Sequence, residues 1–171
     1  MCSWYIIAID VGIKNLGICV FDLVKGQVVY WKNESLVPPG GKYIPMLNVQ
    51  YVKDFIDKHK FYFEAAAQVI VERQMRCNMR IIEALLQSTF YDRCLIISAH
   101  SVKKQYDLST NNYRGNKLKA VEFMTAFSQR NPTVFAEGVL QALDTRKKDD
   151  LADSFLLALY YLDTYSNQLQ T

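Results

Sequence analysis

The order of apolar segments along the chain is the feature that most limits its fold. Residues 4–10, 16–22 and 27–31 have the pattern of strands, and only short polar turns separate them. Strands joined this tightly pair as an antiparallel meander. Farther along, helices are predicted at 44–60, 79–91, 116–129 and 149–165, and strands at 68–72 and 94–98. Strands that alternate with helices run parallel, so the pattern predicts an α/β fold with a mixed five-stranded sheet flanked by helices.

A single domain spanning residues 1–171 is the expected organisation. Hydrophobic residues make up 50% of the 171, which is sufficient for one compact core. The charged fraction of 22% argues against intrinsic disorder. No repeat, low-complexity tract or linker divides the sequence, and the clearest breaks fall at 38–41, 109–115 and 131–132.

Cysteine spacing and hydropathy exclude several classes of protein. The four cysteines, Cys2, Cys19, Cys77 and Cys94, are too far apart for a zinc knuckle or a redox motif, so we expect free thiols. Asp10 interrupts the first apolar run, and no segment reaches the roughly 20 apolar residues of a membrane span. The two histidines lie in no motif, which argues against a histidine zinc site. We therefore expect an intracellular protein without a membrane segment.

Carboxylates occur at three places where a charge is costly. Asp10 ends the first apolar strand, and Glu72 ends the strand at 68–72. Asp149, Asp150 and Asp153 open the last predicted helix, where side chains three or four residues apart share one face. The apolar residues farther along that face indicate a helix that is buried for most of its length.

Each of these acids alone has an ordinary explanation. Asp10 could cap the turn toward Gly12, and Glu72 could pair with Arg73. Acids in a first helical turn also favour the helix dipole. Together they favour a shared site, because strands ending at one sheet edge and the amino end of a helix would bring four carboxylates into one cleft. Hard divalent cations such as Mg²⁺ or Mn²⁺ relieve that repulsion, and two of them can clamp a phosphodiester for hydrolysis.

Positive residues recur beside the acidic segments. Those that we expect to contact nucleic acid, besides Lys117, are Lys14, Arg73, Arg76, Lys103, Lys104, Arg114, Lys119, Arg146, Lys147 and Lys148. Basic side chains next to a group of carboxylates would hold phosphates at the metal ions. The net charge of +3 and the pI of about 8.6 permit a nucleic-acid partner without requiring one. The distribution of charge, rather than its total, favours nucleic acid over an ordinary solvated surface.

Four segments resemble the RuvC-like Holliday junction resolvases. They are residues 9–17 (IDVGIKNLG), 71–74 (VERQ), 113–117 (YRGNK) and 148–155 (KDDLADSF), and they occur in the same order over most of the chain. The likeness is greatest to the enzymes of poxviruses and related large-DNA viruses, with the fungal mitochondrial enzymes next. The first and last segments are fairly specific together, whereas either alone is weak. The sequence departs from the poxvirus enzymes at 75–79, which is less basic.

The resemblance implies an RNase H-like fold and a homodimer that makes paired, Mg²⁺-dependent incisions across a four-way DNA junction. It implies two ions per active site, with Mn²⁺ as a substitute, and no small-molecule cofactor or membrane. Asp10, Glu72, Asp150 and Asp153 would be the metal ligands. Asp149 is a neighbouring alternative, although the family's spacing of three residues between these two acids favours Asp150 as the partner of Asp153.

The resemblance also assigns roles outside the acids. Lys117 matches a lysine that stabilises charge at the scissile phosphate, Lys119 is its competitor, and Lys103 resembles a DNA-contacting lysine of the bacterial enzymes. The helix at 79–91 would form the dimer contact, although its apolar residues could equally pack in the core. A viral enzyme of this kind would act in the host cytoplasm during genome recombination and concatemer resolution, and a mitochondrial location is the alternative.

Two other functions remain open at this point. Another RNase H-like nuclease, acting on an RNA–DNA hybrid or an RNA precursor, would use the same acids. A catalytically silent binding module would have lost at least one acid, and all four are present. Lys117 and the wide basic surface favour a four-way junction as the substrate.

Overall fold

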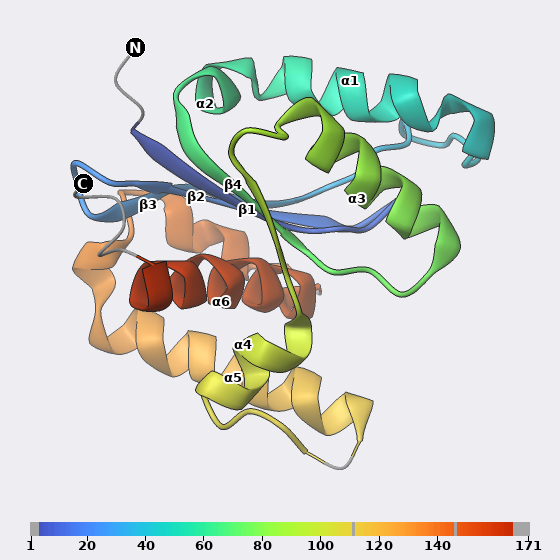
Figure 1. Ribbon diagram of the computed structural model, residues 1–171. Coiled ribbons are helices and arrows are strands. Elements are labelled where there is room, and N and C mark those ends of the chain that lie inside the picture. The colour runs from blue at the N-terminus through green and yellow to red at the C-terminus, as the bar shows by residue number, and fades with distance from the viewer. Residues whose placement is uncertain (1–3, 111, 146, 166–171) are drawn as a thin grey trace.

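The computed structural model describes residues 4–110, 112–145 and 147–165, and it confirms the predicted α/β fold (Figure 1). A five-stranded sheet has the order β3-β2-β1-β4-β5. Its strands are β1 (Tyr5–Asp10), β2 (Leu16–Asp22), β3 (Gln27–Glu34), β4 (Ala66–Glu72) and β5 (Cys94–Ile97). The first three pair antiparallel, whereas β1 with β4 and β4 with β5 are parallel, as the spacing of the segments predicts.

Helices cover both faces of the sheet (Figure 1). One layer contains α1 (Asn48–Lys58), α2 (Lys60–Glu64) and α3 (Cys77–Thr89), and the other contains α4 (Ala99–Gln105), α5 (Tyr113–Arg130) and α6 (Lys148–Tyr165). Single 3₁₀ turns lie at η1 (Pro45–Leu47), η2 (Pro132–Val134) and η3 (Val139–Leu143). Among the described residues, none of the helices combines the length and apolar character needed to cross a membrane.

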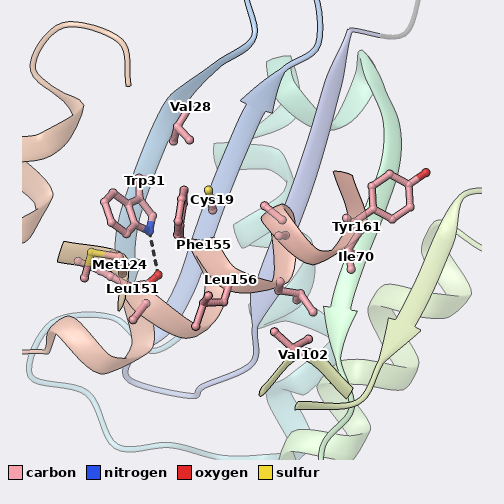
Figure 2. Packing of buried hydrophobic residues seen from close by; sticks show 14 of the residues in the cluster. Cys19, Val28, Trp31, Ile70, Val102, Met124, Leu151, Phe155, Leu156 and Tyr161 are labelled. Carbon is pink, nitrogen blue, oxygen red and sulfur yellow. Dashed lines mark hydrogen bonds between the residues drawn. The ribbon is translucent and has the colours of Figure 1, made fainter. Parts of the chain in front are cut away.

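The alternation of side chains along the strands divides the core into two parts. In β1, Ile6 and Ala8 belong to the cluster that packs against α6, whereas Ile7 and Ile9 belong to the cluster under α1 and α3. Figure 2 shows the α6 side, where Phe155 and other buried side chains of the helix lie on the sheet. Because α6 is buried along most of its length, its amino end is held at one edge of the sheet.

One helix departs from its predicted bounds at both ends, and a short helix was not predicted. The helix predicted at 44–60 begins only at Asn48, because Pro45 opens a 3₁₀ turn, and it ends where the backbone of His59 leaves the helical region. Helix α4 was not predicted, and it begins where the Ser98 hydroxyl accepts a hydrogen bond from the His100 N–H at 3.2 Å. Short capped helices of this kind carry too little periodicity to be recognised in a sequence.

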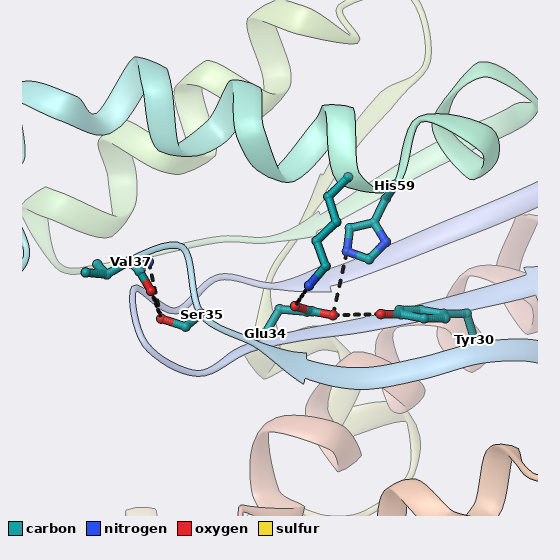
Figure 3. A network of polar contacts seen from close by, with 6 residues as sticks. Tyr30, Glu34, Ser35, Val37 and His59 are labelled. Atoms are coloured by element: carbon teal, nitrogen blue, oxygen red, sulfur yellow. Dashed lines mark hydrogen bonds and ion pairs between the residues drawn. The ribbon is translucent and has the colours of Figure 1, made fainter. Parts of the chain in front are cut away.

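A partly buried polar cluster connects the end of α1 to strand β3 (Figure 3). The Tyr30 hydroxyl donates to Glu34 at 2.6 Å, Lys58 pairs with the same carboxylate, and His59 Nε2 lies 3.7 Å from it. Burial acts to raise the pKa of Glu34, but the hydrogen bonds from Lys58 and Tyr30 outweigh it and lower that pKa. Burial lowers the pKa of His59, so its imidazole is neutral at neutral pH. The cluster lies on the sheet face opposite α6.

The outer edge of β3 is partly covered by the segment around η2. Val28 and Phe135 form a parallel bridge, and the Ala136 N–H donates to the Val28 carbonyl at 2.9 Å. The Gln27 side chain also donates to the Thr133 carbonyl at 2.8 Å. Backbone groups at this end of the edge strand therefore have partners within the chain.

Candidate active site

Two acids come from neighbouring parallel strands and lie at the same edge of the sheet. Asp10 ends β1 and Glu72 ends β4, and the register places Ile9 opposite Val71, one residue before each acid. Parallel strands carry their carboxyl ends to one edge, which is why residues more than 60 positions apart meet here. This is the arrangement that the sequence predicts.

The amino end of α6 brings the remaining acids to this edge. Asp149 and Asp150 lie in its first turn, and Asp153 follows one turn later on the buried side. Gly17 of β2, which pairs with Asp10, lies directly against this turn, because a Cβ built on it would be 2.3 Å from the Asp150 carbonyl oxygen. Only glycine permits this approach of strand and helix.

The acids act on one another electrostatically. Burial raises the pKa of Asp10 well above its usual range, and the charges of Glu72, Asp153 and Asp150 raise it further. Burial and then Asp153 raise the pKa of Glu72 to about 7. Burial also raises the pKa of Asp153 and of Asp150. Like charges that perturb one another in this way lie in one cluster, and a cation is the natural means of neutralising them.

Two lysines already neutralise part of the cluster. Lys103 Nζ of α4 lies 3.3 Å from Asp153 Oδ1, with both side chains largely buried. Lys117 of α5 pairs with Asp149 and lies over the Tyr113 ring, with its Nζ 5.1 Å from the ring centre. Burial opposes the charge of Lys117, but the hydrogen bond to Asp149 raises its pKa. Lys119, the competing lysine, instead donates to the backbone carbonyl of Asp107 at 3.4 Å.

Asp149 and Asp150 differ in their surroundings although they are adjacent. Asp149 is bound by Lys117, and this hydrogen bond lowers its pKa against the opposing effect of burial. Asp150 Oδ2 is buried without a hydrogen-bond partner. A buried carboxylate oxygen without a donor is costly unless a cation binds it. Carboxylate oxygens of this kind are the ligands that Mg²⁺ and Mn²⁺ prefer, so the donor set fits a hard divalent cation.

The acids do not form a closed ligand set as they stand. In the described part of the chain, no three acidic, histidine or cysteine side chains are arranged closely enough to enclose a metal ion. Lys103 and Lys117 hold one carboxylate each. A divalent cation would replace Lys103 as the partner of Asp153, whereas Lys117 would stay on Asp149.

Most of the predicted DNA-contacting residues have exposed side chains. Those whose side chains are exposed are Lys14, Arg73, Arg76, Lys104, Arg114, Lys119, Lys147 and Lys148. Lys103 and Lys117 instead lie among the acids. Arg146 lies outside the described residues.

Two residues of β3 at this edge were missed by the sequence analysis. The Trp31 indole donates to the Leu151 carbonyl at 3.0 Å, and the Asn33 amide donates to the Lys147 carbonyl at 2.7 Å. A strand ending in tryptophan and asparagine has no distinctive pattern. The one available signal was the alternation that puts both side chains on the same face of β3.

A family model described as "Poxvirus A22 protein" matches residues 4–165, and the chain belongs to this family. No curated protein sequence matches the chain significantly.

Solved structures of three organisms share the fold. The yeast mitochondrial Holliday junction resolvase Ydc2 is 18% identical, with a TM-score of 0.69 over 99% of this chain and 84% of that one. The fowlpox virus Holliday junction resolvase is 18% identical, with a TM-score of 0.65 over 94% of this chain and 98% of that one. RuvC of T. thermophilus is 13% identical, with a TM-score of 0.56 over 95% and 97% of the two chains.

Proposed function

We propose that this protein is a Holliday junction resolvase. A single domain spanning residues 1–171 would form a homodimer that makes paired, symmetric incisions in four-way DNA junctions. The observation that carries the proposal is the meeting of Asp10, Glu72 and the α6 acids at one sheet edge, in a chain of the Poxvirus A22 family. The fowlpox virus resolvase, which shares the fold, has been solved with its substrate Holliday junction DNA. The corresponding role is viral genome recombination and concatemer resolution in the host cytoplasm.

Asp10, Glu72, Asp150 and Asp153 are the residues that would hold the divalent cations. Their mutually raised pKa values and the partnerless Asp150 Oδ2 support this assignment. We propose two Mg²⁺ ions per site, with Mn²⁺ as a substitute, because this number and type suit phosphodiester hydrolysis. Bound there, the ions would supply positive charge that activates the attacking water and stabilises the leaving oxygen.

The protein side chains contribute binding and charge around these acids. Lys117, held between Asp149 and the Tyr113 ring, keeps a fixed positive charge beside the cluster, where the scissile phosphate would lie. Asp149 is a positioning residue in this scheme, because it orients Lys117. The exposed basic residues would bind the phosphates of the junction arms.

Lys103 and Lys104 are expected to behave differently although they are adjacent. Replacing the exposed Lys104 with Ala should weaken junction binding and lower the slope of log affinity against log salt by about 1. Replacing Lys103, which pairs with Asp153, should mainly change the Mg²⁺ concentration required for cleavage. Binding titrations at several salt concentrations measure the first effect, and magnesium titrations measure the second. Lys25→Ala, in the exposed turn at the other end of the sheet, is the control, and an equal change in its slope contradicts the assignment of Lys104.

The outward face of α3 is the proposed dimer contact. Ile81 is 41% exposed there and borders an open hollow of about 520 Å³ that Met75, Cys77, Arg80, Ala84 and Leu85 also line. Ile81→Glu should convert the dimer to a monomer in sedimentation, because a charge would be buried at the contact. It should also replace paired incision of a junction by single nicks. Leu118→Glu on α5, where the leucine is 57% exposed, is the matched control and should remain dimeric. A dimer that survives Ile81→Glu places the contact elsewhere.

Cleavage assays on matched substrates test the proposed function itself. A four-way junction, a flap, a linear duplex and an RNA–DNA hybrid of the same sequence are offered with Mg²⁺, and the products of both strands are mapped. The expected result is symmetric, ligatable nicks in the junction and much weaker cutting of the other substrates. Preferred cutting of the hybrid would assign the protein to another branch of RNase H-like nucleases, and no cutting of any substrate with Mg²⁺ or Mn²⁺ would contradict nuclease function.

A further inference from the structure

A row of residues crosses three strands at the active-site edge. Asp10 of β1 pairs with Gly17 of β2, and Gly17 pairs with Asn33 of β3. The amino end of α6 lies on this row, because Gly17 touches its first turn and Asn33 binds a carbonyl just before it. The position of the helix is therefore fixed by β2 and β3, on the side away from Glu72.

Two side chains of β3 bind the backbone of α6 one turn apart. Asn33 donates to the carbonyl of Lys147 at 2.7 Å, and Trp31 donates to the carbonyl of Leu151 at 3.0 Å. Figure 2 shows the indole of Trp31 directed at the Leu151 carbonyl. The two carbonyls are four residues apart, so they lie on one side of the helix. A carbonyl oxygen has two lone pairs, so it can accept a side-chain donor besides its helical partner.

These hydrogen bonds act against a specific force. Asp150 lies in the segment 147–151 that Trp31 and Asn33 bind, and Asp153 follows two residues after it. The charges of both acids repel Asp10 and Glu72. Lys103 and Lys117 neutralise only part of this repulsion, and the remainder pushes the first turn of α6 away from the sheet when no divalent cation is bound. The Asn33 amide donates from Nδ2 to the Lys147 carbonyl, while its own Oδ1 is buried without a hydrogen-bond partner. A buried oxygen without a partner is energetically unfavourable.

We propose that Trp31 and Asn33 are positioning residues that hold the first turn of α6 against the sheet, so that Asp150 and Asp153 are preorganised for divalent cations. This inference rests on the proposed nuclease function. The two hydrogen bonds from Trp31 and Asn33 form a clamp on α6 that also acts in the metal-free protein. Neither side chain belongs to the acids that would hold the metal, and both bind the backbone at the start of α6. Preorganised ligands bind a cation more tightly because less ordering accompanies binding.

The test uses variants that each remove one donor. Trp31→Phe keeps an aromatic ring against Phe135 and Phe155 but loses the indole N–H. Asn33→Leu keeps a branched side chain but loses the amide. The matched controls are Trp4→Phe, at a tryptophan that is 42% exposed, and Asn131→Leu, whose amide donates to the Phe127 carbonyl of α5 at 3.1 Å.

Two measurements separate the clamp from general packing. In metal-free protein, the amides of residues 151–155 should exchange with solvent about fivefold faster in each clamp variant, and those of α5 should not change. Calorimetric titration with Mg²⁺ should show a dissociation constant about fivefold higher for each variant and unchanged for both controls. Junction binding without metal should stay within about twofold of the unmodified protein, which shows that the variants remain folded.

The outcomes judge the clamp independently of the nuclease proposal. Because the exchange measurement needs neither metal nor substrate, faster exchange confined to the start of α6 supports the clamp even in a protein that does not cut DNA. Unchanged exchange in Trp31→Phe and Asn33→Leu overturns it. Faster exchange throughout α6 and the sheet also overturns it, because the residues would then contribute only to general packing.

Discussion

Replacing Asp10 with Asn is expected to lower junction cleavage by on the order of 10³-fold or more while leaving junction binding almost unchanged. The carboxylate lies at the centre of the cluster, where Glu72, Asp153 and Asp150 all act on it. An amide keeps the shape of the side chain but removes the charge that would hold a divalent cation. Glu72→Gln and Asp153→Asn should behave in the same way. Single-turnover cleavage and metal-free binding of the same labelled junction measure the two effects separately.

The helix that carries three of the acids also offers a control for this series. Asp163, near the other end of α6, accepts a hydrogen bond from the Tyr106 hydroxyl at 2.8 Å, and Asp163→Asn should retain cleavage within about threefold. Asp149→Asn should impair cleavage less than Asp150→Asn, because Asp149 acts through Lys117. Substantial cutting by Asp10→Asn, or equal losses in Asp163→Asn, would remove the acid cluster from the chemistry.

The metal-free protein is expected to lose stability as the pH rises through about 7, and Mg²⁺ should restore it. Burial and Asp153 raise the pKa of Glu72 to about 7 from an ordinary value of 4.5. A carboxyl whose pKa is raised by folding favours the folded state while it is protonated, and this contribution disappears as the pH rises through the folded pKa. The loss amounts to a few kcal/mol, on the order of 1.4 kcal/mol for each unit of pKa difference. A divalent cation stabilises the charged form and reverses the loss.

Glu72→Gln removes the contribution of Glu72 together with its effect on the pKa of Asp10. His59 acts in the opposite direction, because burial lowers its pKa and protonation below that value destabilises the folded state. Comparison of Glu72→Gln with the unmodified protein cancels the contribution of His59 to the pH dependence of stability. Thermal unfolding with EDTA should show Glu72→Gln more stable than the unmodified protein at pH 8 and similar to it at pH 5, and Mg²⁺ should remove the advantage. If the stabilities of the two proteins change in parallel with pH, the surroundings do not raise the pKa of Glu72.

Much of the fold follows from periodicity that is readable in the sequence. The strand ending at Asp10 is apolar on both faces, as a central strand must be, and the short turn after it predicts pairing with the next strand. The short elements were missed for a physical reason. Helix α4 depends on a single cap at Ser98 and on contacts with α6, and α1 ends at His59, whose side chain lies beside Glu34 of β3. Such contacts are tertiary and leave no local pattern.

The sequence was sufficient to predict which acids lie together in the candidate site, but not which side chains pair with them. Strand ends and a helix start were sufficient to bring Asp10, Glu72 and the α6 acids together. Spacing alone could not separate Asp149 from Asp150, because side chains three and four residues from Asp153 share its face. What separates them is Lys117, which approaches from a helix more than 30 residues away in the chain. Trp31 was unremarkable in the sequence because its role depends on a carbonyl of α6.

The covered edge of β3 limits how copies of this protein can associate. An open edge strand invites other molecules to add strands, and such addition has no natural end point. Here the chain around Phe135 already occupies the start of that edge, and the opposite edge, β5, is only 4 residues long. Open-ended association of copies by strand addition is therefore disfavoured at both the β3 and the β5 edge. Two copies would therefore contact each other through helical surfaces. A closed dimer matches a substrate that has two equivalent strands to cut.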